Sequence, residues 1–183
     1  MSNTLKALLA GHPENAPAIG APDRDWLTYG GLRALAGSVG SALHTAGVGR
    51  GDRVAIVLPN GPEMAAAFIT VAQTAVTAPL NPAYRTDEFA FYIEDLKAKA
   101  VVLMDGDDGP AYEAAKKLGV ALLRVSADPA TPAGQFTLSA EVSGTCDTSP
   151  PDADDVALIL HTSGTTSRPK IVPLLQSNVA ASA

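Results

Sequence analysis

Apolar positions recur along this chain with two periods, one typical of helices and one typical of buried strands. Between residues 32 and 43 they fall every three or four residues, which places them on one face of a helix. The members of this face are Leu32, Leu35, Ala36, Val39 and Leu43, and Gly47 and Gly49 close the helix. The continuous apolar run at 54–58 then predicts a strand buried on both faces of a parallel sheet.

The same periodicities extend over the first 125 residues and predict alternating helices and strands. Further helices are expected at residues 5–10, 63–76, 86–97 and 111–118. Further strands are expected at 18–20, 26–29, 77–80, 101–103 and 120–125, with a turn at Pro22-Asp23 between the first two. Thr86 is expected to cap its helix. Strands that alternate with helices predict a mostly parallel sheet with flanking helices, so the expected fold class is α/β.

The pattern changes after residue 125. Residues 126–155 are dominated by Pro, Thr, Ser, Gly and Asp, which predicts a long irregular connection with one strand near 136–138. Because such a long connection is uncommon inside a compact domain, we expect it to lead into a second layer or subdomain. Residues 1–125 are thus expected to form an α/β unit, and 156–183 a strand, a loop and the start of a helix.

Composition narrows the class of protein. The chain of 183 residues is 46% hydrophobic and 17% charged, with a net charge of −6 and no basic patch, which excludes the usual nucleic-acid partners. The single cysteine, Cys146, excludes an internal disulfide and suits a reducing compartment. We find no apolar run long enough to cross a membrane and no secretory leader, so a cytoplasmic location is expected.

One segment carries recognisable chemistry. The apolar strand expected at 155–160 is followed at once by a loop rich in hydroxyls, with one glycine and a lysine at its end. Its candidate ligand-binding residues are Thr162, Ser163, Gly164, Thr165, Thr166, Ser167 and Lys170. Hydroxyl and backbone N–H donors can surround phosphate oxygens, and a lysine adds a point charge. The spacing is not that of a Walker A loop, and spacing alone also allows an ordinary solvated turn.

The complete residue sequence of this loop identifies a protein family more specifically than the spacing of its glycine and lysine does. Residues 162–170, Thr-Ser-Gly-Thr-Thr-Ser-Arg-Pro-Lys, resemble the signature loop of the adenylate-forming superfamily, which includes acyl-CoA synthetases, peptide-synthetase adenylation domains and luciferases. Upstream segments resemble the same family in the same order, namely Trp26-Leu27-Thr28-Tyr29, Gly51 to Ile56 with Leu58-Pro59-Asn60, and Pro79 to Tyr84 with Glu88 and Phe91-Tyr92.

The resemblance implies that residues 1–183 are the N-terminal portion of a large AMP-binding domain. It implies ATP-dependent activation of a small-molecule carboxylate to an acyl-adenylate, then transfer to coenzyme A, with Mg²⁺ accompanying the nucleotide. The loop residues would hold the β and γ phosphates, and Lys170 would steady the departing pyrophosphate. The carboxylate pocket, the acidic metal ligand and the catalytic lysine would belong to a missing C-terminal part. This stretch alone is therefore expected to be inactive and to hold no catalytic residue or metal ligand.

Two departures from the family pattern bear on the substrate and the loop. Ser167 replaces a glycine, and with Arg168 and His161 it resembles the variant loop of oxalate–CoA ligases, which makes oxalate the leading substrate. Fatty-acid or amino-acid activation, or a truncated nucleotide-binding module, are the alternatives.

Ile171 also replaces a glycine, so that position is either strained or simply extended. Leu175 stands where relatives carry a helix-capping hydroxyl, and His161 is expected to pack rather than to catalyse.

Overall fold

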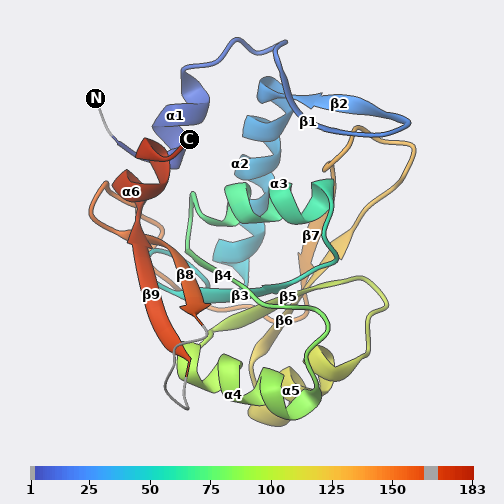
Figure 1. Ribbon diagram of the computed structural model, residues 1–183, viewed down its shortest axis with the longest axis vertical. Helices are drawn as coiled ribbons and strands as arrows, with labels where there is room; N and C mark the ends of the chain where they lie inside the picture. The colour runs from blue at the N-terminus through green and yellow to red at the C-terminus, as the bar shows by residue number, and fades with distance from the viewer. Residues whose placement is uncertain (1–2, 163–168) are drawn as a thin grey trace.

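A computed structural model describes residues 3–162 and 169–183 of the chain. Its elements alternate as the periodicities predict (Figure 1). The helices are α1 (Leu5–Ala10), α2 (Tyr29–Thr45), α3 (Pro62–Val71), α4 (Thr86–Leu96), α5 (Pro110–Leu118) and α6 (Gln176–Ala181). The strands are β1 (Pro17–Ala21), β2 (Arg24–Thr28), β3 (Arg53–Val57), β4 (Val76–Pro79), β5 (Ala100–Met104), β6 (Ala121–Ser126), β7 (Thr137–Ala140), β8 (Val156–Thr162) and β9 (Lys170–Leu175).

The main sheet is mostly parallel, as expected for an α/β fold. Its strand order is β7-β6-β5-β3-β4-β8-β9. The five inner strands run parallel, and β7 and β9 pair antiparallel at the two edges. The central strands β3 and β5 are almost wholly buried, because helices cover both of their faces.

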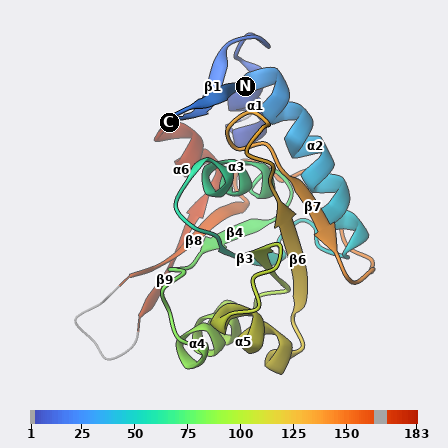
Figure 2. The same cartoon turned by 90° about the vertical axis from the view of Figure 1, so that its right-hand side faces the viewer.

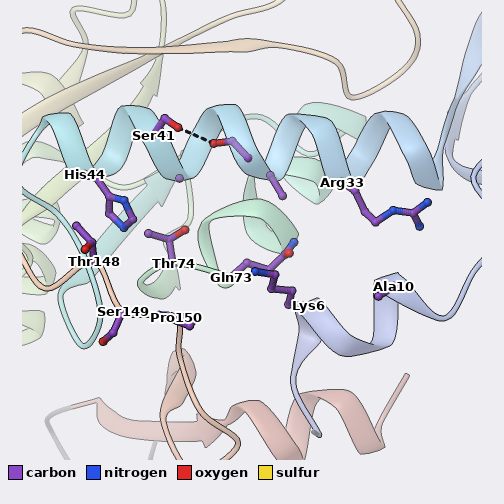
Figure 3. A pocket seen from close by; sticks show the side chains of 13 residues that line it. Lys6, Ala10, Arg33, Ser41, His44, Gln73, Thr74, Thr148, Ser149 and Pro150 are labelled. Carbon is purple, nitrogen blue, oxygen red and sulfur yellow. Dashed lines mark hydrogen bonds between the residues drawn. The ribbon is translucent and has the colours of Figure 1, made fainter. Parts of the chain in front are cut away.

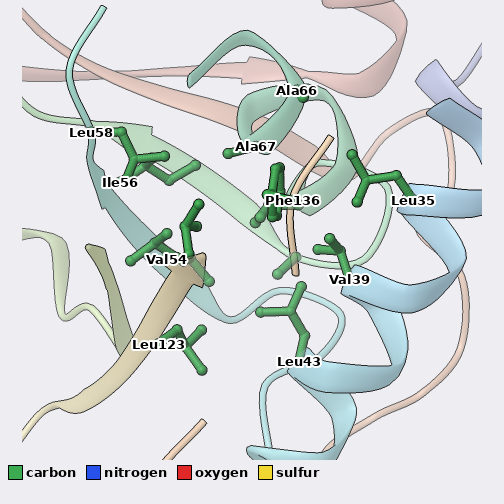
Figure 4. Close-up of a cluster of buried hydrophobic side chains, with 14 of the residues drawn as sticks. Leu35, Val39, Leu43, Val54, Ile56, Leu58, Ala66, Ala67, Leu123 and Phe136 are labelled. Carbon is green, nitrogen blue, oxygen red and sulfur yellow. The ribbon is translucent and has the colours of Figure 1, made fainter. Parts of the chain in front are cut away.

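Helices α2 and α3 cover one face of the sheet, and α4 and α5 cover the other (Figures 1 and 2). The predicted apolar face of α2 is confirmed, since all five of its members are buried. Three of them, Leu35, Val39 and Leu43, lie in one cluster with residues of β3 and β6 (Figure 4). On the opposite face Phe89, Ile93 and Leu96 of α4 are buried against the same sheet.

A separate hairpin, β1–β2, lies beside α3. Its turn places Asp23 at φ 59°, a conformation that aspartate tolerates better than most residues. Arg24 Nη1 lies 2.6 Å from Glu63 Oε1 on α3, and both side chains are 18% exposed. The hairpin is therefore joined to the helical layer by a largely buried ion pair.

Within the described residues, the connection 126–155 leads back into the same sheet rather than into a second layer. It first adds β7 to one edge of the sheet, and the chain then crosses to the other side, where β8 pairs with β4 in the same sheet. Close backbone contacts hold this crossing. A Cβ at Gly49 would lie 2.0 Å from the carbonyl oxygen of Asp147, which only glycine permits. Arg50 N donates to that carbonyl at 3.0 Å.

Two predicted helix boundaries are wrong. The helix expected at 63–76 ends at Val71, because 72–75 form a turn and Val76 already belongs to β4. Its Ala-rich sequence has no glycine or proline to mark that end. The cap residue of α4 is Arg85 rather than Thr86, and Glu88 Oε2 accepts from Arg85 N at 2.9 Å. An acidic side chain thus satisfies a free N–H of the first turn.

Strand β8 is less buried than its apolar sequence predicts, since Leu160 is 39% exposed. The reason is its position next to the edge strand β9. Ile171 lies in β9, opposite His161, so its position is extended and the alternative of a strained backbone is wrong. Among the described non-glycine residues, only Asp23 and Lys97 have a positive φ. No described helix is both long enough and apolar enough to cross a membrane.

Candidate functional site

The strand order has a switch point between β3 and β4, at the carboxyl edge of the sheet. The chain leaves β3 for α3 on one face and leaves the neighbouring strand β4 for α4 on the other. Ligands of open α/β sheets bind where adjacent strands send their loops to opposite faces. Because β8 runs parallel to β4, its last residue, Thr162, emerges at this same edge. The hydroxyl-rich loop therefore begins at the same edge of the sheet as this switch point.

The structure brings the two ends of the predicted loop together. Thr162 and Lys170 are directly opposite in the antiparallel β8–β9 ladder, and both are exposed. Their side chains thus lie on the same face of the hairpin, as cross-strand partners do. The remaining predicted residues, Ser163, Gly164, Thr165, Thr166 and Ser167, lie outside the described residues.

His161, just before the loop, packs against α4 as expected. Its side chain is 7% exposed, and its ring meets the ring of Tyr92 edge-on, with centroids 4.7 Å apart. Tyr92 in turn stacks on Tyr84 at 4.9 Å. Burial, with a hydrogen bond to Tyr92, raises the pKa of Tyr84 to about 12, so this phenol stays neutral and acts as a packing group. The neighbouring Arg85 is exposed.

Asp95 is a residue that the sequence did not single out. Its Oδ2 lies 3.1 Å from His161 Nε2. It stands three residues after Tyr92 on α4, so the two share a helix face. That spacing was the only signal available, because the partner lies 66 positions further along the chain.

Two cavities lie in a different part of the molecule. One of about 520 Å³ lies between α1, α2 and the segment 148–150, with Arg33, Ser41 and His44 of α2 on one wall (Figure 3). A neighbouring one of about 310 Å³ is lined by residues of α1 and Gln176. Both include residues that precede β4 and β8, which places them at the amino edge of the sheet. None of the predicted site residues lines either cavity.

Metal binding has little support among the described residues. Within 3–162 and 169–183, no three His, Cys, Asp or Glu side chains are grouped so that they could hold a metal ion.

The described residues form an α/β domain in which Thr162 and Lys170 face each other at the carboxyl edge of the sheet. The chain belongs to the AMP-binding enzyme family, whose model matches residues 5–183.

Individual relatives agree with this assignment. Oxalate–CoA ligase of Arabidopsis thaliana is 38% identical over 99% of this chain and 37% of its own length. The oxalate–CoA ligase of Saccharomyces cerevisiae is 35% identical over 73% of this chain and 29% of its own length. The crystal structure of ATP-bound MatB from Rhodopseudomonas palustris superposes with a TM-score of 0.78 at 30% identity, over 100% of this chain and 36% of that one. The chain thus spans between 29% and 37% of the length of these three proteins.

Proposed function

We propose that the complete protein containing this chain is an acid–thiol ligase that uses ATP to join a carboxylic acid to coenzyme A. The observation that carries the proposal is the signature loop, which starts from a strand at the carboxyl edge and has Thr162 and Lys170 paired at its base. Membership of the AMP-binding family supports it.

The chemistry proceeds in two steps. An oxygen of the substrate carboxylate attacks the α-phosphorus of ATP, the bond to the bridging oxygen breaks, and pyrophosphate leaves. The thiol of coenzyme A then attacks the acyl carbon and AMP departs. In both steps the protein contributes mainly position and charge neutralisation. Mg²⁺ bound to the triphosphate would offset further negative charge.

Each loop residue has a role in this proposal. Backbone and hydroxyl donors of the loop hold the β and γ phosphates, and the ammonium of Lys170 neutralises the charge that develops on the leaving pyrophosphate. The residues in the first role are Thr162, Ser163, Gly164, Thr165, Thr166 and Ser167. The loop sequence contains no side chain that could act as a general base, so we propose that these residues bind and orient rather than react.

Oxalate is the proposed acid. The Ser167-Arg168 pair after His161 resembles the loop of oxalate–CoA ligases, and two relatives carry that name. Relatives named for sulfoacetate and for long-chain fatty acids also match, at 31% and 30% identity, so other acids are the competing candidates. A nucleotide-binding module without catalysis is the alternative from a different class.

The test is acid-dependent exchange of labelled pyrophosphate into ATP by the product of the complete reading frame, with oxalate, sulfoacetate, a fatty acid and an amino acid compared. We expect oxalate to give the highest rate. Lys170→Ala should lower that rate by about 100-fold or more, the usual effect of losing a transition-state charge partner. Lys117→Ala, an exposed lysine at the end of α5, is the matched control and should leave the rate unchanged.

The results separate the candidates. Exchange with another acid alone would replace oxalate but keep the reaction. ATP binding without exchange for any acid would favour the non-catalytic module. Normal exchange by Lys170→Ala would contradict the role given to this lysine.

A further inference from the structure

The end of the β8–β9 hairpin extends beyond the rest of the sheet. The β4–β8 ladder has a single register pair, Thr77 opposite Leu158. The β8–β9 ladder continues for four more pairs, up to Thr162 opposite Lys170. Residues 159–162 and 170–173, here called the distal ribbon, are therefore only two strands wide. A two-stranded ribbon is marginally stable by itself in water, so contacts outside the sheet must hold it in place.

The polar contact that holds the distal ribbon is the pair of His161 and Asp95. His161 Nε2 and Asp95 Oδ2 are 3.1 Å apart, within hydrogen-bonding distance. A carboxylate can only accept, so Nε2 must carry the proton. The imidazole is 7% exposed and the carboxylate 37%, which shields the bond from water on the histidine side. This bond joins the strand that ends at the loop to a helix of the main domain.

Aromatic packing restricts the same imidazole in a second direction. The ring of Tyr92 meets it at an interplanar angle of 66° and is itself stacked on Tyr84 at 14°. Ile171, the cross-strand partner of His161, packs against the same apolar cluster beneath α4. Apolar packing resists separation of the ribbon from α4 but is not directional, whereas the hydrogen bond to Asp95 fixes where along the helix the ribbon sits.

We infer that Asp95 is a positioning residue for nucleotide binding: acting through His161, it holds the distal ribbon, and with it Thr162 and Lys170, against α4. Asp95 itself contacts no nucleotide. The effect on ATP rests on the proposed function, because donors to the β and γ phosphates must be held within a fraction of an ångström of their productive positions. Binding of the acid and of coenzyme A does not depend on this contact.

The test compares four variants of the complete protein with the wild type. Asp95→Ala removes the acceptor, Asp95→Asn keeps an acceptor oxygen, and His161→Phe keeps a ring against Tyr92 but loses the hydrogen bond. Glu94→Ala, an exposed acidic residue of the same helix, controls for lost charge. Three readouts are needed: the Kd of ATP by titration calorimetry, the KM values of the three substrates, and amide hydrogen exchange of the distal ribbon.

We expect Asp95→Ala and His161→Phe each to raise the Kd and KM of ATP by about tenfold, the effect of one net hydrogen bond. Combining them should add little, because they remove the same contact. Asp95→Asn should stay within about threefold of the wild type, Glu94→Ala should not differ from it, and the KM values for acid and coenzyme A should not change. Amides of the distal ribbon should exchange faster in the two disruptive variants only.

Each outcome of these measurements either supports or overturns the inference about Asp95. An unchanged ATP affinity and unchanged exchange in a folded Asp95→Ala protein would overturn the inference and leave the proposed function intact. Faster ribbon exchange in a protein that forms no adenylate would support the positioning contact while the proposed function fails. Equal rises in all three KM values would show a general structural defect and would overturn the specific role in ATP binding.

Discussion

At the scale of single residues, the most consequential polar contact in the core region is the ion pair of Arg24 and Glu63. Arg24 Nη1 reaches the carboxylate at 2.6 Å, and its Nη2 donates to the carbonyls of Thr131 and Pro132 at 3.3 and 3.1 Å. One guanidinium thus joins the β1–β2 hairpin, α3 and the long connection. A contact that serves three segments is costly to break, because the remaining groups stay partly buried and lose their partner.

The stability that this ion pair contributes to the fold depends on pH. Burial alone would raise the pKa of Glu63, but the hydrogen bond from Arg24 and those from backbone N–H groups outweigh it and hold the pKa below its ordinary value of 4.5. A lowered pKa stabilises the fold above the ordinary value, and this stabilisation is lost as the pH falls through the folded-state pKa. Glu63→Gln should therefore cost about 1–3 kcal/mol at pH 7, and the gap to the wild type should close in acid.

Urea denaturation of the chain at pH 7 and at successively lower pH measures this gap. Glu94→Gln, which changes an exposed carboxylate, should leave the free energy of unfolding within about 0.5 kcal/mol of the wild type at pH 7. A Glu63→Gln deficit that persists unchanged in acid would show that the pair contributes nothing through its charge.

At the scale of elements, the first and last helices are held together by one buried amide. Gln176 is 1% exposed and begins α6. Its Oε1 accepts from Leu5 N of α1 at 3.1 Å, and its Nε2 donates to Ala72 O, just after α3, at 2.6 Å. Segments 171 and 104 positions away in the sequence thus share one side chain. Both partners are backbone groups that would otherwise be buried without a hydrogen bond.

Gln176→Met keeps the length of this side chain but removes both hydrogen bonds. It should lower the free energy of unfolding by about 1–3 kcal/mol, the cost of burying unpaired backbone groups. Gln73→Met is the matched control, because Gln73 Nε2 donates to a carbonyl only four positions earlier in the chain, Ile69 O at 3.2 Å, and its side chain is half-buried. Equal losses for the two variants in urea denaturation would contradict the bridging role.

At the scale of the whole molecule, one face of the β8–β9 hairpin is apolar and only partly covered. Leu158 pairs with Leu174 and Leu160 with Val172, so all four side chains lie on the same face. Leu160 is 39% exposed and the other three are half-buried. Strand β9 also forms an edge of the sheet as described. An apolar face beside a sheet edge is a site for association with another polypeptide surface.

The 183-residue chain should therefore self-associate as its concentration rises. Leu160→Thr, which introduces a β-branched strand former and removes exposed apolar surface, should shift the equilibrium toward the monomer, as measured by light scattering after size-exclusion chromatography. Val142→Thr, at a position 45% exposed in the long connection, is the control and should leave association unchanged. A wild-type chain that stays monomeric at all concentrations would contradict the role of this face.

Much of the fold could be predicted from the sequence, because local periodicity reflects which faces of each element are buried. The apolar face of α2 and the buried strand β3 appeared as patterns over 32–43 and 54–58, and the structure confirms both. The signature loop could be found from its residue string alone, although its site roles remain a proposal. Boundaries without a glycine or proline, such as the end of α3 at Val71, were missed.

The sequence by itself thus determined the type of most elements, the α/β class and the family. Only the tertiary structure decided that β8 joins the same sheet beside β4, that Thr162 faces Lys170, and that His161 meets Asp95 on α4. The physical reason is the distance along the chain over which each interaction acts. Periodicity and capping act between residues a few positions apart, whereas strand order and long-range hydrogen bonds depend on how buried surfaces and unpaired polar groups of distant segments are satisfied together.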